Sequence, residues 1–212
     1  MRVLVIGTED LTGEHVIKQL SDKQHEAVAL VGTKSKVEEM GRLGAKDVFV
    51  LENDDYAQAF SACDAVIYVG DASARTGESK PILIDHQSVI DSVQAAKDQG
   101  VKRFLLMSAM RANETDKGGS GTDGAKNQPE ELLRNAHLTY TILRTGKPVD
   151  KPGKGKVEAS LSLESKESEI PKEDIATVLV EALELEEAYN RTIEVSSGEM
   201  PIREALQQIS SD

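Results

Sequence analysis

The first residues in the chain whose types and spacing could do chemistry are two glycines after an apolar run. The stretch VLVIGTEDLTGEHV covers residues 3–16, with Gly7 ending the apolar run and Gly13 six residues later. In a dinucleotide-binding turn, the first glycine permits a tight turn and the last lets the following helix pack on the strand. The pair therefore indicates a turn that could hold a diphosphate at a helix N-terminus.

An acid occupies the middle position of this glycine frame. A glycine there lets the diphosphate approach bare backbone, whereas Asp10 brings a carboxylate to the same place. Because like charges repel, we expect Asp10 to weaken the binding of a diphosphate. A second interpretation stays open, in which Asp10 or Thr12 caps the first helix. With Leu11 between them, these residues complete the predicted cofactor turn.

Short, mostly continuous apolar runs predict the strands that position this turn. They cover residues 2–7, 26–32, 47–51, 64–70, 103–108 and 139–144. Such runs are typical of strands buried on both faces, as in a parallel sheet. Helical patterns alternate with them, so the predicted fold class is α/β, a doubly wound, mostly parallel sheet flanked by helices.

The length of 212 residues suits one domain, residues 1–212. Ligands of doubly wound sheets bind beyond the carboxyl ends of the strands. Irregular segments at 71–81, 111–129 and 145–157 follow predicted strands and should lie over that edge. We expect the part from about residue 145 to residue 212 to complete the ligand edge.

Composition excludes several classes of partner. The net charge of -12 disfavours nucleic acid and anionic membranes, and no apolar stretch reaches transmembrane length. Capture of a phosphorylated ligand must then depend on a local positive site. The single cysteine, Cys63, excludes an internal disulfide and fits a cytoplasmic location, and the four histidines show no metal-ligand spacing.

The chain resembles atypical members of the short-chain dehydrogenase/reductase superfamily, the small NAD(P)H-binding and NAD-dependent epimerase-like proteins. The resemblance covers nearly the whole chain and implies a single Rossmann-like domain with a dinucleotide, NADP or NAD, as its small-molecule partner. It rests on the segments VLVIGTEDLTGEHVIKQL, CDAVIYVGDAS, LIDHQSVIDSVQAAKDQGVKRFLLMSAM, LTYTILRTG, IPKEDIATVLVEAL and VSSGEMPIREAL. It also implies that Gly70, at the end of the fourth predicted strand, contacts the cofactor.

Catalytic members of this superfamily use a serine, a tyrosine and a lysine, with the tyrosine four residues before the lysine. By resemblance, Ser108 matches the serine and Lys126 matches the lysine, which also holds the cofactor ribose. Thr122 stands where the tyrosine is expected. A threonine hydroxyl does not ionise near neutral pH, so we expect hydride transfer to be weakened or absent. Substitute proton donors would be Ser108, His86 or a water held by Lys126.

The end of the second predicted strand sets the type of cofactor in this superfamily. Gly32 stands where relatives commonly have an arginine, and no acid replaces it. The segment Thr33, Lys34, Ser35 and Lys36 could hold a 2′-phosphate, which favours NADP slightly over NAD. The alternative is a solvated helix start capped by Ser35, without a role in binding.

Three functions remain open from the sequence. The first, which we favour, is an NAD(P)(H)-binding protein of the oxidoreductase or epimerase-like type with weakened or absent catalysis. The second is an active NAD(P)H-dependent reductase whose proton donor is not a tyrosine. The third is an interaction protein on the same fold that binds no cofactor. The sequence indicates neither a substrate nor an oligomeric state.

Overall fold

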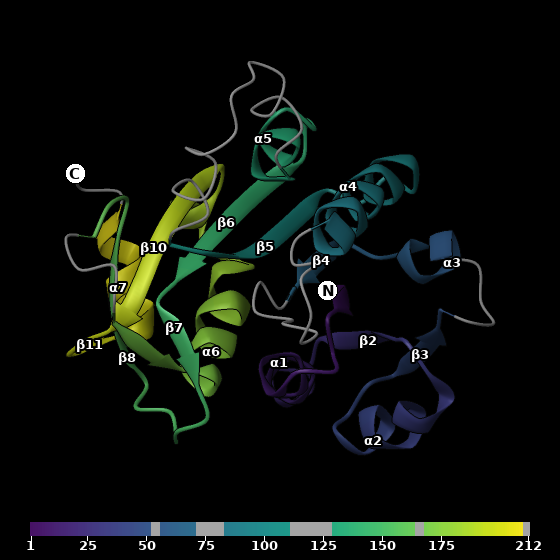
Figure 1. The fold of residues 1–212 in the computed structure, drawn as a ribbon, viewed down its shortest axis with the longest axis horizontal. Helices are drawn as coiled ribbons and strands as arrows, with labels where there is room; N and C mark the ends of the chain where they lie inside the picture. Colours follow the sequence, from purple (N-terminus) through teal and green to yellow (C-terminus); the bar gives the residue numbers. More distant parts are fainter. Residues whose placement is uncertain (52–55, 71–82, 111–128, 164–167, 210–212) are drawn as a thin grey trace.

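The computed structural model describes residues 1–51, 56–70, 83–110, 129–163 and 168–209 (Figure 1). Within these ranges, a nine-stranded sheet has helices on both of its faces. The order of its strands is β11-β8-β10-β6-β5-β4-β1-β2-β3. The bounds are β1 (Arg2–Ile6), β2 (Glu26–Val31), β3 (Asp47–Val50), β4 (Ala65–Tyr68), β5 (Arg103–Ala109), β6 (Thr139–Thr145), β8 (Lys156–Ser160), β10 (Arg191–Ser197) and β11 (Met200–Pro201).

The pairing of the strands confirms the predicted fold class. Each adjacent pair of strands from β3 to β10 in the sheet order is parallel, and β8 is antiparallel to both β10 and β11. The chain leaves β1 for β2 on one side and later returns to β4 on the other. This reversal is the point where ligands bind in open parallel sheets, because helices from the two sides leave a gap there.

Two apolar cores show which helices cover which face. One core joins the sheet to α1 (Leu11–Asp22), α2 (Val37–Arg42), α6 (Lys172–Ala182) and α7 (Ile202–Gln208). The other joins it to α3 (Tyr56–Phe60), α4 (Leu83–Asp98) and α5 (Pro129–Arg134). Short 3-10 turns lie at η1 (Lys34–Lys36) and η4 (Glu186–Ala188). In α1 the buried stripe is Val16, Ile17 and Leu20, the spacing expected of one helical face.

The segment 145–157 is more regular than the sequence suggests. It contains β7 (Lys147–Val149), which pairs in parallel with β9 (Glu169–Pro171), and it ends in the first residues of β8. Its prolines and glycines interrupt any alternating apolar pattern, so the pattern gives no strand signal. Pairing with a partner about twenty residues later forms β7 through backbone bonds, which a sequence pattern does not report.

Helix α6 is anchored at its C-terminal end by a side chain from the sheet. Arg103, which is buried at the start of β5, donates to the carbonyl oxygen of Ala182 at 2.8 Å. Its guanidinium also donates to Thr141 Oγ1 at 2.6 Å and lies 4.5 Å from the ring centre of Tyr189. A cation at the last carbonyls of a helix satisfies them and favours the helix dipole. The anchor holds α6 beside α1 (Figure 1).

Candidate functional site

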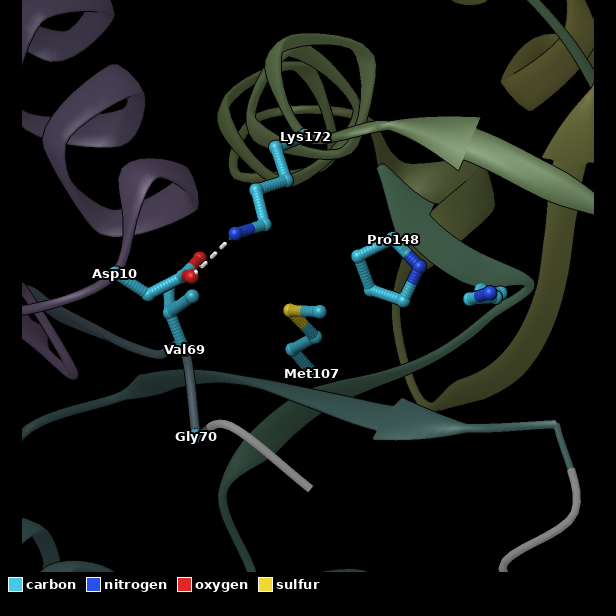
Figure 2. A pocket seen from close by; sticks show the side chains of 7 residues that line it. Asp10, Val69, Gly70, Met107, Pro148 and Lys172 are labelled. Atoms are coloured by element: carbon cyan, nitrogen blue, oxygen red, sulfur yellow. Dashed lines mark hydrogen bonds and ion pairs between the residues drawn. The ribbon is translucent and has the colours of Figure 1, made fainter. Parts of the chain in front are cut away.

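A pocket of about 180 Å³ lies at the carboxyl ends of the central strands (Figure 2). It is bordered by the turn before α1, the ends of β4 and β5, the short strand β7 and the start of α6. Ligand pockets usually exceed about 300 Å³, so this pocket would hold one part of a dinucleotide and not the whole. Its described lining residues are Asp10, Val69, Gly70, Met107, Lys147, Pro148 and Lys172.

The glycine turn beside this pocket has no room for side chains at either predicted glycine. Gly7 has a φ of +87°, and a Cβ atom there would lie 1.8 Å from the carbonyl oxygen of Val69. A Cβ atom on Gly13 would lie 2.4 Å from the carbonyl oxygen of Gly7. The first glycine therefore makes the tight turn and the last brings α1 close to β1, the roles that a dinucleotide turn assigns to them.

Asp10 caps the helix that follows the turn. Its side chain accepts a hydrogen bond from the backbone N–H of Thr12 at 2.8 Å, and its backbone is extended, as N-cap residues are. Of the two residues that the sequence offered as caps, Asp10 fills that place. Thr12 is fully buried in the first turn, and Leu11 is 42% exposed at the start of α1.

The charge of Asp10 is compensated by a residue from the far end of the chain. Lys172, the first residue of α6, places its ammonium 2.7 Å from Asp10 Oδ2 and 2.9 Å from Asp150 Oδ1. Figure 2 shows the lysine and the aspartate pointing toward one another across the rim of the pocket. Asp10 and Asp150 balance the charge of Lys172, and Lys147 is a second cation that lines the pocket.

Proton affinities agree with an ion pair at this rim. Burial alone would raise the pKa of Asp10, but hydrogen bonds from Lys172 and the Thr12 N–H outweigh burial and lower this pKa. Burial alone would lower the pKa of Lys172, but its hydrogen bonds to Asp10 and Asp150 raise it. Both groups are therefore charged at neutral pH. Asp10 presents to the pocket an ionised carboxylate whose charge is balanced by Lys172.

An acid reaches the end of β2 from the glycine turn, although no acid follows this strand in the sequence. The Glu9 carboxylate accepts a hydrogen bond from the backbone N–H of Gly32 at 3.1 Å. Thr8, its neighbour, is buried and donates from Oγ1 to the Leu30 carbonyl at 2.9 Å, which fixes the turn against β2. Sequence reasoning missed Glu9 because its side chain comes from the glycine turn and not from the strand that it caps.

The lysines near β2 are not equivalent. Lys36 places its ammonium 2.7 Å from Glu39 Oε2 and 3.4 Å from Glu14 Oε1, so two carboxylates surround it. Lys34 and Thr33 are exposed. Ser35 is not a helix cap, since its hydroxyl lies 2.8 Å from Thr33 Oγ1 and η1 starts without a side-chain capping bond.

Ser108 belongs to a buried network of charged groups at the ends of β5, β6 and β10. Its hydroxyl donates to Glu130 Oε1 at 2.7 Å. Arg144 donates to both oxygens of Glu130, at 3.2 Å and 2.6 Å, and lies 3.8 Å from Glu194 Oε1. Arg144 is therefore paired with acids inside the fold.

This network decides what the Ser108 hydroxyl can do. Burial alone would raise the pKa of Glu130, but hydrogen bonds from Arg144 and Ser108 outweigh burial and hold this pKa below its usual range. An ionised carboxylate only accepts hydrogen bonds, so Ser108 must be the donor in its bond to Glu130. The Ser108 hydroxyl proton is then engaged in the hydrogen bond to Glu130. The hydroxyl oxygen can only accept hydrogen bonds from other groups.

The remaining predicted residues of the catalytic set are not all described. Thr122 and Lys126 lie outside the described residues. His86 lies in the first turn of α4. Within the described ranges, no three metal-ligating side chains form a group, and none of the helices could span a membrane.

A family model of NAD(P)H-binding proteins matches residues 10–186. The chain belongs to this NAD(P)H-binding family. Among the similar members and neighbours is the uncharacterized sugar epimerase YhfK of Bacillus subtilis, 29% identical over 99% of this chain and 100% of the relative. A solved structure from Bacillus halodurans, described as an NAD-dependent epimerase/dehydratase, is 31% identical to this chain. The two superpose with a TM-score of 0.87 over 99% of this chain and 100% of the Bacillus halodurans chain.

The NAD(P)H-binding family places this chain among Rossmann-like proteins, as expected from the sequence. A short-chain dehydrogenase/reductase of Veillonella parvula, solved in complex with NADP, shares the fold, with a TM-score of 0.68 at 13% identity. That alignment covers 94% of this chain and 96% of the Veillonella chain. Membership of the family and the glycine turn agree on a dinucleotide site, and neither names a substrate.

Proposed function

We propose that this chain is an NAD(P)(H)-binding protein of the oxidoreductase or epimerase-like type whose hydride-transfer catalysis is weak or absent. The observation that carries the proposal is the turn from Gly7 to Gly13, whose glycines allow the tight turn and the close packing that bring the N-terminus of α1 to the pocket. In dinucleotide-binding folds the diphosphate lies at the N-terminus of the helix that follows such a turn.

The residues present suit a dinucleotide in most respects. The glycine turn and the start of α1 would hold the diphosphate, and Gly70 and Met107 would border the nicotinamide end. A nicotinamide cofactor would supply the hydride for a reduction. Asp10 departs from the pattern, but the Lys172 ammonium at 2.7 Å offsets its charge, so the turn can still accept an anion.

Weak catalysis is supported by the state of Ser108. Protonation of a reduced carbonyl needs a group that can give up a proton near neutral pH. The proton of Ser108 is held by Glu130, and Arg144 keeps that carboxylate ionised. This hydrogen bond argues against Ser108 as the proton donor in place of a phenol.

The three functions separate in two measurements. Titration of the purified protein with NADH and NADPH, followed by the fluorescence of the reduced nicotinamide, should show saturable binding. No binding of either would favour an interaction protein without a cofactor. Oxidation of both cofactors against a panel of carbonyl and quinone substrates should then be very slow or absent. Robust saturable turnover that is lost in Ser108→Ala would instead show an active reductase that uses Ser108.

The effect of Asp10 on binding can be tested with a variant that costs the helix little stability. Asp10→Gly removes the carboxylate, restores bare backbone and frees the Lys172 ammonium for the diphosphate. Since glycine is a tolerated N-cap, the stability cost should be only a few tenths of a kcal/mol. We expect NADH and NADPH to bind about tenfold more tightly, as measured by the same titration.

Two further variants control this experiment. Asp10→Asn keeps the capping oxygen and removes only the charge, so its affinity should lie between those of the wild type and Asp10→Gly. Lys172→Met leaves Asp10 uncompensated and should weaken both cofactors. Equal affinity in Asp10→Gly and the wild type would show that Asp10 does not face the diphosphate.

A further inference from the structure

The end of β2 carries a carboxylate that is held in place by backbone. Glu9 accepts from the Gly32 N–H at 3.1 Å, and the preceding Thr8 is tied to the Leu30 carbonyl at 2.9 Å. One oxygen of Glu9 makes the bond to Gly32. The second oxygen, Oε2, has no hydrogen-bond partner among the described residues and can accept a further hydrogen bond.

Glu9 fills the space that a side chain at position 32 would use. A Cβ atom built on Gly32 would lie 2.6 Å from Glu9 Oε1, and no other described atom except the carboxyl carbon of Glu9 lies within 4 Å of it. The absence of a side chain at Gly32 therefore leaves room for the Glu9 carboxylate, which comes from the glycine turn.

Other charges nearby do not reverse the sign of this place. Lys36 is paired with Glu14 and Glu39 and so has little positive charge to offer. Lys34, the other lysine of this segment, is exposed. Counting these five side chains, three acids oppose two lysines, so the local charge is negative.

We propose that Glu9 is the specificity-determining residue of the cofactor site and selects NAD(H) over NADP(H). This inference rests on the proposed dinucleotide function. In sheets of this type the end of the second strand faces the adenosine ribose, where an acid accepts from the 2′- and 3′-hydroxyls and a cation accommodates a 2′-phosphate. Glu9 accepts from the hydroxyls of NAD(H) and repels the phosphate of NADP(H). It reverses the slight preference for NADP that the lysines alone suggest.

The test compares dissociation constants for NADH and NADPH in the wild type and in Glu9→Gln. The amide retains an oxygen for the Gly32 N–H, so the variant changes charge and leaves the turn in place. We expect the wild type to bind NADH about tenfold more tightly than NADPH, and Glu9→Gln to lose most of that difference. Glu38→Gln, an exposed acid in the first turn of α2, makes the same change in net charge and should preserve the preference.

A double variant tests the same arrangement in the other direction. Glu9→Ser with Gly32→Arg empties the space beside position 32 and places a cation there. Gly32 has no left-handed φ, so a side chain is compatible with its backbone. We expect this variant to prefer NADPH.

Each outcome of these titrations decides one claim. A wild type that binds both cofactors equally, or NADPH more tightly, overturns the selection by Glu9 while the proposed function stands. A wild-type preference for NADH that persists in Glu9→Gln also overturns the role of Glu9. No binding of either cofactor overturns the proposed function, and the selection with it.

Discussion

Replacing Arg144 with methionine is expected to lower the free energy of unfolding by about 3–5 kcal/mol. Arg144 is the main partner of Glu130, which is 6% exposed, and it also lies beside Glu194, which is 4% exposed. Without the guanidinium, these two buried carboxylates face one another with less compensation. Urea unfolding followed by circular dichroism measures the loss.

Two comparisons isolate the buried charge as the cause. Arg134→Met removes the other arginine of Glu130, whose side chain is 30% exposed, and should cost about 1 kcal/mol. Adding Glu130→Gln to Arg144→Met should recover part of the loss, because one unpaired charge disappears. Equal losses for the two arginine variants would contradict a dominant role for Arg144.

The pH dependence of stability follows from the same network. The pKa of Glu130 is lowered in the folded protein, although burial alone would raise it, because Arg144 and Ser108 stabilise the charged form. Its contribution to stability is therefore present above the pKa of an unfolded glutamate and is lost as pH falls through the lower folded-state pKa. Arg144→Met should lose most of this acid-side dependence.

Replacing Gly7 with alanine is expected to cost about 4 kcal/mol of stability and to abolish dinucleotide binding. The methyl group would lie 1.8 Å from the Val69 carbonyl oxygen, and that atom belongs to backbone beside β4. Strand and turn would have to separate to make room. Urea unfolding and cofactor titration on the same protein measure both effects.

Gly100→Ala provides a matched control for the backbone conformation. Gly100 also has a positive φ, +73°, but a Cβ atom there meets nothing within 4 Å. The control should cost only about 1 kcal/mol, the price of the left-handed backbone, and should leave binding unchanged. If both variants lose the same stability, the contact with Val69 is not the cause.

Features set by local pattern could be predicted from the sequence. The apolar runs gave the parallel strands, because a strand buried on both faces is apolar along its length. Gly7 and Gly13 were predicted for the places where they lie, since only glycine satisfies the close contacts of the turn. The cap at Asp10 was one of two interpretations of this residue. An acid at a helix start is compatible both with capping the helix and with repelling a diphosphate, so the sequence does not distinguish them.

Features set by distant residues could not be predicted. Lys172 is 162 positions from Asp10, and no spacing in the sequence indicates that α6 places it on the turn. Glu9 reads as a solvated turn residue until the sheet order brings the turn beside Gly32. Ser108 could be placed at a strand end, but the acid that holds its proton lies in α5, after a segment without a clear pattern.

The pairing of Asp10 with Lys172 has a consequence for synthesis of the chain on the ribosome. Residues 7–13 emerge first, but the lysine that neutralises Asp10 is 162 residues behind it. Because synthesis proceeds at about 5–20 residues per second, Lys172 is added roughly 8–32 s after Asp10. During that interval the nascent chain carries a glycine turn with an uncompensated acid, which repels anions. The ability to take up a dinucleotide therefore arrives with α6, when most of the sheet has already left the ribosome.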